Sequence, residues 1–339
     1  MMKVLPWMYN KKIIEEISPE MRYDGKESFD AWQKRAKEKL AELLGMKNIK
    51  KADDTHFTIE YVKEAEDYTE YRFTLESEIG YVFPSVMRVP KGIEGKLPVI
   101  ICLQGHSTGM HISLGTPIFP NDVNSISGGD RDFVVRGVKE GFVSVAVEQR
   151  NFGECGGDPE KGSPMCHVSS MSAIINGRTT IGERIHDVSC VIDALIDNFD
   201  FIDADKINLM GNSGGGTATY YAACLEERIK LAMPSCAVCT YKDSIAAMNH
   251  CVCNFIPNIA NYFDMGDLAG MIAPRKLVVV NGKKDVIFPD EGVRESYEII
   301  KRMYEAAGVP DYCALVTGEE GHRFYADAAW PVAKELMNK

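Results

Sequence analysis

Short, predominantly apolar runs recur along the chain from residue 98 onward. They lie at Pro98–Leu103, Phe142–Val147, Ile207–Met210, Leu231–Cys236, Lys276–Val280 and Tyr312–Val316. A strand that is apolar at consecutive positions is buried on both faces, which is typical of parallel strands covered by helices. The pattern therefore predicts six parallel strands.

Segments with helical spacing separate these runs. Helices are predicted at Asp132–Lys139, Thr180–Phe199, Gly214–Glu226, Met265–Ile272, Gly292–Ala307 and Tyr325–Met337. Repeated alternation of strand and helix predicts a doubly wound α/β domain, with helices on both faces of a mostly parallel sheet. Two stretches rich in Gly, Ser and Pro, Thr108–Gly129 and Arg150–Asn176, show no clear period. We expect them to be long loops of the kind that shape active sites in this fold class.

The first ninety residues have a different pattern. Phe29–Met46 carries apolar side chains at helical spacing with Gly45 near its end, which predicts an amphipathic helix that packs on the main domain. Alternating or β-branched runs follow at Thr55–Val62, Thr69–Leu75 and Tyr81–Val89. These runs predict antiparallel strands at the start of the sheet.

Charge and composition narrow the class of protein. Of the 339 residues 45% are hydrophobic and 26% charged, which is ordinary for a folded globular chain. The 38 Lys and Arg against 49 Asp and Glu leave a net charge of −11, which disfavours binding to nucleic acid or an acidic membrane. We therefore expect neither as a partner.

Cysteines and apolar segments bear on the cellular compartment. No apolar run approaches the length needed to span a bilayer, and the apolar start of the chain is broken by Pro6, too early for a signal peptide. The ten cysteines are scattered through a long chain rather than spaced as a disulfide framework. Reduced thiols and a cytoplasmic location are expected.

The segment Gly211-Asn212-Ser213-Gly214-Gly215 matches G-x-S-x-G between a predicted strand and a predicted helix. This is the context of a nucleophile elbow, where glycines permit a strained turn and the serine lies at the positive end of a helix. The backbone N–H of Gly214 could then donate to an oxyanion. A phosphate-binding loop fits less well, because Thr217 and Ala218 stand where Lys and Ser or Thr are needed. A turn that serves only packing is the remaining alternative.

A nucleophilic serine needs a base and an orienting acid, which follow it in the order Ser, Asp or Glu, His in this type of site. Asp285 comes just after the apolar strand Lys276–Val280, and His322 is the one histidine of seven that follows it. Both would lie at the carboxyl edge of the sheet, where functional groups of α/β domains gather. Asp290 is the main alternative for the acid, but Asp285 combines a preceding strand with a Gly-containing turn.

The loop after the first parallel strand offers a second oxyanion donor. It reads Gln104-Gly105-His106, and the backbone N–H of His106 is the candidate. We expect no metal and no cofactor, because the Cys251 and Cys253 pair with one neighbouring histidine lacks a zinc-binding spacing and no H-E-x-x-H occurs. Arg184 and Asp187, three residues apart on a predicted helix, are interpreted as a structural pair.

Several further motifs extend beyond the candidate catalytic triad of Ser213, Asp285 and His322. They are Gly141-Phe142-Val143 with Glu148-Gln149-Arg150-Asn151-Phe152-Gly153-Glu154, Gly177-Arg178-Thr179 with Gly182-Glu183-Arg184 and Asp187, Ile272-Ala273-Pro274-Arg275-Lys276-Leu277 leading into Asn281-Gly282-Lys283-Lys284-Asp285, and Gly321-His322-Arg323-Phe324. On these residues, the chain over about 55–339 resembles the bacterial acetyl xylan esterase and dienelactone hydrolase-like branch of the α/β-hydrolase superfamily. The resemblance implies Ser213 as nucleophile, Asp285 as acid and His322 as base, with 51–339 as the catalytic domain and 1–50 as an N-terminal helical extension.

The chain departs from that branch at three positions. Dienelactone hydrolases proper use a cysteine at the elbow, so Ser213 favours ester hydrolysis instead. Gln104 stands where many relatives have the histidine of a His-Gly pair, and Asn151 replaces the glycine of an Arg-Gly pair.

The resemblance implies a serine carboxylesterase that acts on O-acyl esters of a small molecule or oligosaccharide, with an O-acetyl group on a xylo-oligosaccharide as the first expectation. The alternatives are a feruloyl or other aryl esterase, a peptidase or amidase on the same fold, and a catalytically silent binding protein. Residues 1–50 could cover the substrate pocket as a lid or form a subunit contact in a homo-oligomer.

Overall fold

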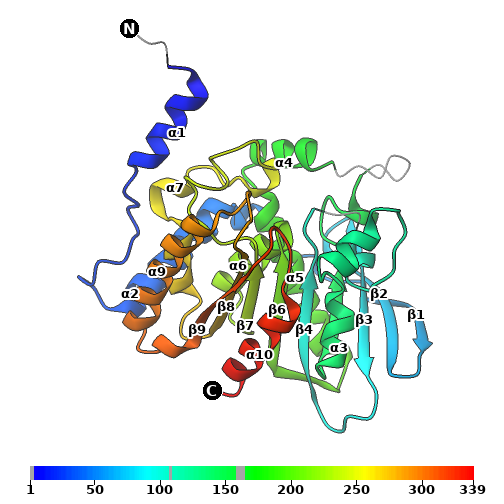
Figure 1. Cartoon of the computed structure of the whole chain (residues 1–339). Coiled ribbons are helices and arrows are strands. Elements are labelled where there is room, and N and C mark those ends of the chain that lie inside the picture. Colours follow the sequence, from blue (N-terminus) through cyan, green and yellow to red (C-terminus); the bar gives the residue numbers. More distant parts are fainter. Residues whose placement is uncertain (1–3, 107–108, 158–164) are drawn as a thin grey trace.

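A computed structural model describes residues 4–106, 109–157 and 165–339 of the chain (Figure 1). Residues 1–3, residues 107–108 at the start of one predicted loop, and residues 158–164 of the other predicted loop lie outside this description. The strands are β1 Thr58–Glu64, β2 Tyr68–Glu78, β3 Tyr81–Pro90, β4 Leu97–Leu103, β5 Val143–Val147, β6 Ile202–Asn212, β7 Ile229–Ser235, β8 Lys276–Gly282 and β9 Cys313–Gly318. The α-helices are α1 Pro6–Glu16, α2 Phe29–Leu44, α3 Phe133–Lys139, α4 Cys166–Ile175, α5 Thr180–Asn198, α6 Gly214–Leu225, α7 Ile259–Tyr262, α8 Met265–Leu268, α9 Asp290–Ala306 and α10 Ala326–Met337.

The strands form one mixed sheet in the order β1-β2-β3-β5-β4-β6-β7-β8-β9. Pairing is antiparallel from β1 to β3 and between β3 and β5, and parallel from β5 through β4 to β9. The predicted fold class is therefore confirmed: antiparallel strands open a sheet whose remaining strands are parallel and covered by helices.

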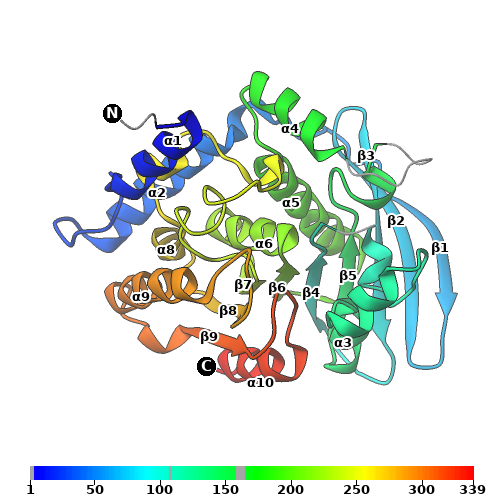
Figure 2. The ribbon, with the colours of Figure 1, turned by 45° about the horizontal axis from the view of Figure 1, so that its top comes forward.

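Helices cover both faces of the sheet (Figure 2), and an apolar layer lies between the sheet and the helices on each side. Side chains of α5, α6 and α9 pack on one face together with Val99 and Ile101 of β4. Side chains of α3 and α10 pack on the other face together with Ile100 and Cys102 of the same strand. Because consecutive side chains of a strand point to opposite faces, a strand between two helical layers must be apolar throughout. This is the physical origin of the continuous apolar runs.

Three helices, α1, α4 and α7, were not predicted from the sequence, and one predicted helix is different. α4 lies inside the stretch Arg150–Asn176 that was expected to be a loop, α1 precedes the predicted extension helix, and α7 is a single short turn of four residues. The single helix expected at Met265–Ile272 is instead α8 followed by a 3₁₀ turn at Ala269–Met271. α4 escapes the periodicity argument because it buries only three side chains over its ten residues.

The N-terminal segment contacts the domain unevenly. α2 buries Trp32, Leu40 and Leu44 in the larger core, as predicted for this helix. α1 buries no side chain, and Trp7 on it is 64% exposed. Figure 1 shows α1 in dark blue at the periphery of the domain. The division of the chain at residue 50 stays a prediction.

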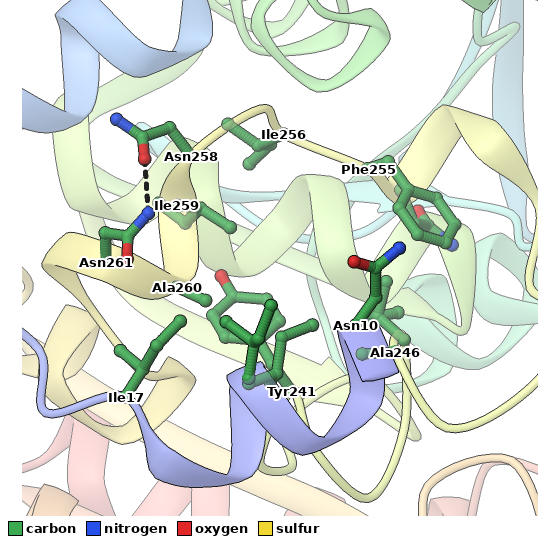
Figure 3. Close-up of a pocket in the computed structure, with 14 residues that line it drawn as sticks. Asn10, Ile17, Tyr241, Ala246, Phe255, Ile256, Asn258, Ile259, Ala260 and Asn261 are labelled. Atoms are coloured by element: carbon green, nitrogen blue, oxygen red, sulfur yellow. Dashed lines mark hydrogen bonds between the residues drawn. The ribbon is translucent and has the colours of Figure 1, made fainter. Parts of the chain in front are cut away.

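A pocket of about 320 Å³ lies between α1 and the segment that contains α7 (Figure 3). Asn10 of α1 and Ile17, the residue after this helix, line the pocket together with Tyr241, Ile256 and Ile259. None of the residues predicted to be catalytic lines this pocket. None of the helices within 4–106, 109–157 and 165–339 has both the length and the apolar character needed to cross a membrane.

Candidate active site

Ser213 occupies a strained turn between β6 and α6. Its φ and ψ are 55° and −124°, a conformation that residues other than glycine rarely adopt. The turn is held from two sides, because the Ser213 N–H donates to the Ser235 carbonyl at 2.8 Å and the Ser213 carbonyl accepts the Thr217 N–H at 2.8 Å. The strand, sharp turn and helix predicted for an elbow are therefore present.

The glycines around Ser213 allow the backbone to approach closely. A Cβ on Gly211 would lie 2.5 Å from the Gly215 carbonyl oxygen, and one on Gly215 would lie 2.1 Å from the Leu103 carbonyl oxygen. Real Cβ atoms are not found at such distances from oxygen. Only glycine fits at these two positions, which accounts for the motif physically.

Asp285 and His322 form the contact expected of an acid and a base. Asp285 lies in the loop after β8 and His322 in the loop after β9, and His322 Nδ1 is 2.7 Å from Asp285 Oδ2. Asp285 Oδ1 also accepts the backbone N–H groups of Ile287 at 2.8 Å and Phe288 at 3.2 Å. Burial alone would raise the pKa of Asp285, but these hydrogen bonds and the imidazole outweigh it and lower the pKa below its ordinary value. The carboxylate is therefore kept ionised.

The His322 ring is held in one orientation. It stacks on Phe288, with centroids 6.0 Å apart and planes inclined by 15°. Because Nδ1 faces the Asp285 carboxylate, a neutral imidazole carries its proton there and keeps Nε2 as an acceptor. Within the described residues the Ser213 hydroxyl has no hydrogen-bond partner, so the structure joins Asp285 to His322 directly and leaves the serine contact open. Such contacts often tighten only when substrate binds.

Ser235 connects the serine turn to the histidine loop. Its carbonyl accepts the Ser213 N–H, and its hydroxyl donates to Asn212 Oδ1 at 2.9 Å while lying 3.5 Å from the carbonyl oxygen of Arg323, one residue after His322. The loops after β6, β7 and β9 therefore meet at the carboxyl edge of the sheet, as the sequence predicted for the triad.

The two candidate oxyanion donors lie next to each other. A Cβ on Gly105 would lie 2.8 Å from Ser213 Cβ, so the loop after β4 contacts the nucleophile. A Cβ on Gly214 would lie 3.0 Å from Cε1 of the His106 ring. Gln104 holds this loop through its side-chain amide, which donates to Ser113 Oγ at 2.6 Å. The donor roles of Gly214 and His106 stay predictions, and the packing places both residues beside Ser213.

Asn151 has a positive φ of 73°. Asparagine tolerates this left-handed conformation better than most residues with a Cβ. This explains how Asn151 stands where the resemblance expected the glycine of an Arg-Gly pair.

Arg150 is the centre of a buried polar network that corrects one interpretation. Arg150 binds Asp187 through two hydrogen bonds of 2.7 and 2.8 Å and also pairs with Glu78 at 2.8 Å. Arg184 instead donates to the Arg150 carbonyl at 2.8 Å. The predicted pairing of Arg184 with Asp187 is therefore wrong, because the planar guanidinium of Arg150 offers Asp187 a bidentate partner.

Glu148 is a buried carboxylate whose hydrogen bonds hold the loops beside the candidate active site. It follows β5, is 2% exposed, and accepts the backbone N–H groups of Met110 at 3.1 Å and Glu154 at 3.2 Å. Burial raises the pKa of Glu148 to about 8, and the two N–H donors only partly offset that effect.

We expect Glu148→Gln to flatten the pH dependence of stability. The folded chain holds the Glu148 proton more tightly than the unfolded chain, in which the group titrates near its ordinary value of 4.5. The contribution is thus fully present below about pH 4.5 and is lost as pH rises towards about 8, by up to about 1.4 kcal/mol per pH unit. Thermal unfolding at about pH 5, 6.5 and 8 measures the slope. Equal slopes in the variant and the parent would show that Glu148 is already ionised in the folded protein.

Two features of the site were not predicted from the sequence. Arg131 donates to the His322 carbonyl at 3.4 Å, and four side chains with metal-ligating atoms meet close to the oxyanion loop. Both depend on contacts between loops that are far apart in sequence, for which local spacing gives no signal.

A comparison of the sequence with models of protein families identifies the family of this chain. The model of the Abhydrolase family matches residues 7–330. This chain belongs to the Abhydrolase family. The match begins at residue 7, so membership in the Abhydrolase family takes in most of the N-terminal segment that the sequence resemblance had left out.

Relatives of this Abhydrolase family member are distant in sequence. The "Putative hydrolase YtaP" of Bacillus subtilis (strain 168) is 24% identical over 254 residues, which are 70% of this chain and 77% of the relative. A solved structure of a "putative acetyl xylan esterase" from Bacteroides fragilis has a TM-score of 0.77 at 18% identity, over 93% of this chain and 83% of the other. The structure of "Methylesterase BT1017" has a TM-score of 0.75 at 20% identity, over 97% and 68%. These structural similarities establish the α/β-hydrolase fold.

Proposed function

We propose that this protein is a serine carboxylesterase. The observation that carries the proposal is the partly buried Asp285–His322 hydrogen bond of 2.7 Å, together with Ser213 on a strained turn at the same edge of the sheet. A carboxylate that holds an imidazole with Nε2 free is the arrangement that activates a serine hydroxyl. The esterase names of the solved relatives support the ester as substrate.

In the proposed mechanism Ser213 Oγ attacks the ester carbonyl while His322 Nε2 takes the hydroxyl proton. Asp285 stabilises the imidazolium that forms, and the N–H groups of Gly214 and His106 bind the oxyanion. His322 then gives the proton to the leaving alcohol, which leaves an acyl group on Ser213. Water activated by the same imidazole releases the acid and restores the serine.

The proposed substrate is an O-acetyl ester of a carbohydrate such as a xylo-oligosaccharide. The name of the Bacteroides fragilis relative and the sequence resemblance support this choice. A substrate panel tests it: p-nitrophenyl acetate, butyrate and octanoate, 4-methylumbelliferyl ferulate, and acetylated xylo-oligosaccharides. We expect the highest kcat/KM on the acetylated oligosaccharides. A preference for the ferulate, or cleavage of an amide alone, would contradict the proposal.

We also propose that the protein works in a reducing compartment such as the cytoplasm. All ten cysteines are free, and eight of them are buried. Disulfides are rare where glutathione and thioredoxin keep thiols reduced. Short oligosaccharides that enter the cell would then be the accessible substrates.

A specific observation favours a second candidate, an acetylated sugar that also carries a carboxylate. A hollow of about 310 Å³ beside His322 is lined by Arg131 and Arg323. Arg323 pairs with Asp130 at 2.8 Å, but Arg131 has no carboxylate partner among the described residues, and its buried Nε has no hydrogen bond. A largely buried guanidinium without a carboxylate partner is costly, and a substrate carboxylate would provide one.

Arg131→Met should weaken selectivity for an acidic sugar. We expect kcat/KM for an acetylated oligosaccharide that bears glucuronic acid to fall about 10- to 100-fold, because a hydrogen bond to a charged group contributes about 1.5–3 kcal/mol. The value for the neutral acetylated oligosaccharide should change little. Parallel assays of the two substrates check this, and equal losses on both would assign Arg131 to support of the His322 loop alone.

A further inference from the structure

Four side chains with soft metal-ligating atoms meet beside the oxyanion loop. One nitrogen of His106 and the sulfurs of Cys166, Cys251 and Cys253 all lie within 4.8 Å of one another. They come from three separate segments: the loop after β4, the first residue of α4, and the loop around the 3₁₀ turn Val252–Asn254 between β7 and β8. In Figures 1 and 2, α4 and the yellow loop region lie at the same end of the sheet.

The spacing of these atoms matches a tetrahedral zinc site. With Zn–S bonds of about 2.3 Å and Zn–N bonds of about 2.0 Å, ligand atoms of a tetrahedron lie about 3.5–3.8 Å apart. Nε2 of His106 is 3.1 Å from Sγ of Cys253, and the largest separation in the set is within 4.8 Å. Shifts of at most about 1 Å would therefore complete a closed site of three cysteines and one histidine.

The charge of the surroundings suits the same ion. Three thiolates and one Zn²⁺ sum to −1, and the Arg184 guanidinium lies 3.9 Å from Cys253 Sγ while being only 1% exposed. Arg184 is fixed there by the Arg150 carbonyl at 2.8 Å and lies over the Phe152 ring at 4.3 Å. The buried charges then balance, whereas thiolates buried without a cation would be costly.

We propose that His106, Cys166, Cys251 and Cys253 bind one structural Zn²⁺. On binding, the three thiols release their protons to solvent, three Zn–S bonds and one Zn–N bond form, and no atom is oxidised or reduced. Thiolate and imidazole ligands favour zinc over magnesium or calcium, which prefer oxygen. The sequence spacing of Cys251 and Cys253 did not predict this site, because the other two ligands are supplied by loops distant in sequence.

The ion would fix the oxyanion loop without touching the substrate. The His106 ring packs against Gly214, since a Cβ there would lie 3.0 Å from Cε1 and 3.1 Å from Nδ1 of the ring. A metal on Nε2 would hold this ring, and with it the backbone N–H of His106, beside the N–H of Gly214. His106 is then a positioning residue through its side chain, and all four ligand atoms would be used by the closed site.

Metal analysis of the full-length chain tests the proposal. We expect about one Zn²⁺ per chain by inductively coupled plasma mass spectrometry after purification under reducing conditions. Chain reconstituted with Co²⁺ should show the intense thiolate-to-cobalt absorption of a tetrahedral site with sulfur ligands. A zinc content that stays below about 0.2 per chain after reconstitution would overturn the proposal. A disulfide between any two of the three cysteines, detected by peptide mass mapping, would overturn it as well.

Matched cysteine variants locate the ion. Cys251→Ser, at the least buried of the three cysteines, and Cys253→Ser should each lower zinc affinity at least about 10-fold and weaken the cobalt band. Cys313→Ser, at a buried thiol at the start of β9, should keep the zinc and the band of the parent. Unchanged zinc content in both Cys251→Ser and Cys253→Ser would place any metal elsewhere. Ser213→Ala removes the proposed nucleophile but leaves the four ligands in place, so it should keep the zinc content of the parent. Its zinc content therefore tests this proposal separately from the proposed esterase function.

Discussion

Ser213→Ala should reduce kcat by about 10⁴- to 10⁶-fold on every ester that the parent hydrolyses. The substitution removes the attacking oxygen, and residual activity would come from substrate binding and the oxyanion donors alone. The fold should persist, because alanine keeps the Cβ of Ser213 and the turn is held by the backbone hydrogen bonds to Ser235 and Thr217. Initial rates with p-nitrophenyl acetate and thermal unfolding by circular dichroism measure the two effects.

Ser296→Ala is the matched control for that experiment. Ser296 is buried on α9, and its hydroxyl has no hydrogen-bond partner in the part of the chain that the structure describes, so its loss should change neither rate nor stability appreciably. Near-parental activity of Ser213→Ala would exclude the serine mechanism. A large loss in Ser296→Ala would show that serine removal disturbs the protein in some other way.

Asp285→Asn should lower kcat about 10⁴-fold. An amide in place of the carboxylate would direct an N–H at His322 Nδ1, which forces the imidazole proton onto Nε2 and removes the base that Ser213 needs. The backbone donors of Ile287 and Phe288 can still bind the amide oxygen, so the loop should keep its conformation. The measured kcat of the variant should therefore be much lower than that of the parent, while its melting temperature should change little.

Asp290→Asn should leave kcat almost unchanged. The Asp290 carboxylate accepts from Asn281 at 2.8 Å and pairs with Arg294 at 2.7 Å, and it makes no contact with His322 among the described residues. This variant controls for loss of a carboxylate at the start of α9, five residues after Asp285. If the effects of the two substitutions were exchanged, Asp290 would be the acid and the Asp285–His322 hydrogen bond would have no role in catalysis.

Burial on both faces made most of the sheet predictable from the sequence. β4, β5, β7 and β8 are predominantly apolar because helices cover them on two sides, and their predicted positions are close to the observed ones. The start of β6 was missed because Asp203 to Lys206 are solvent-exposed or nearly so, and the strand there carries no apolar signal. A half-exposed helix such as α4 could not be predicted from its pattern either, because few of its side chains are buried.

The candidate triad was predictable because each member directly follows a strand of a parallel sheet. Chain order and the carboxyl edge then bring Ser213, Asp285 and His322 into one region. Arg131 and the cluster of His106, Cys166, Cys251 and Cys253 follow no such rule. Their proximity depends on how long loops fold over the sheet, which spacing along the chain does not encode.

Active-site labelling tests the nucleophile most directly. A fluorophosphonate reagent reacts with an activated serine, forming a bond from Oγ to phosphorus while fluoride leaves, and peptide mass mapping then identifies the labelled side chain. We expect one label per chain, on Ser213, with loss of esterase activity in proportion to labelling and no label in Ser213→Ala. Labelling of another residue, or full esterase activity in a chain labelled at Ser213, would contradict its assignment as the nucleophile.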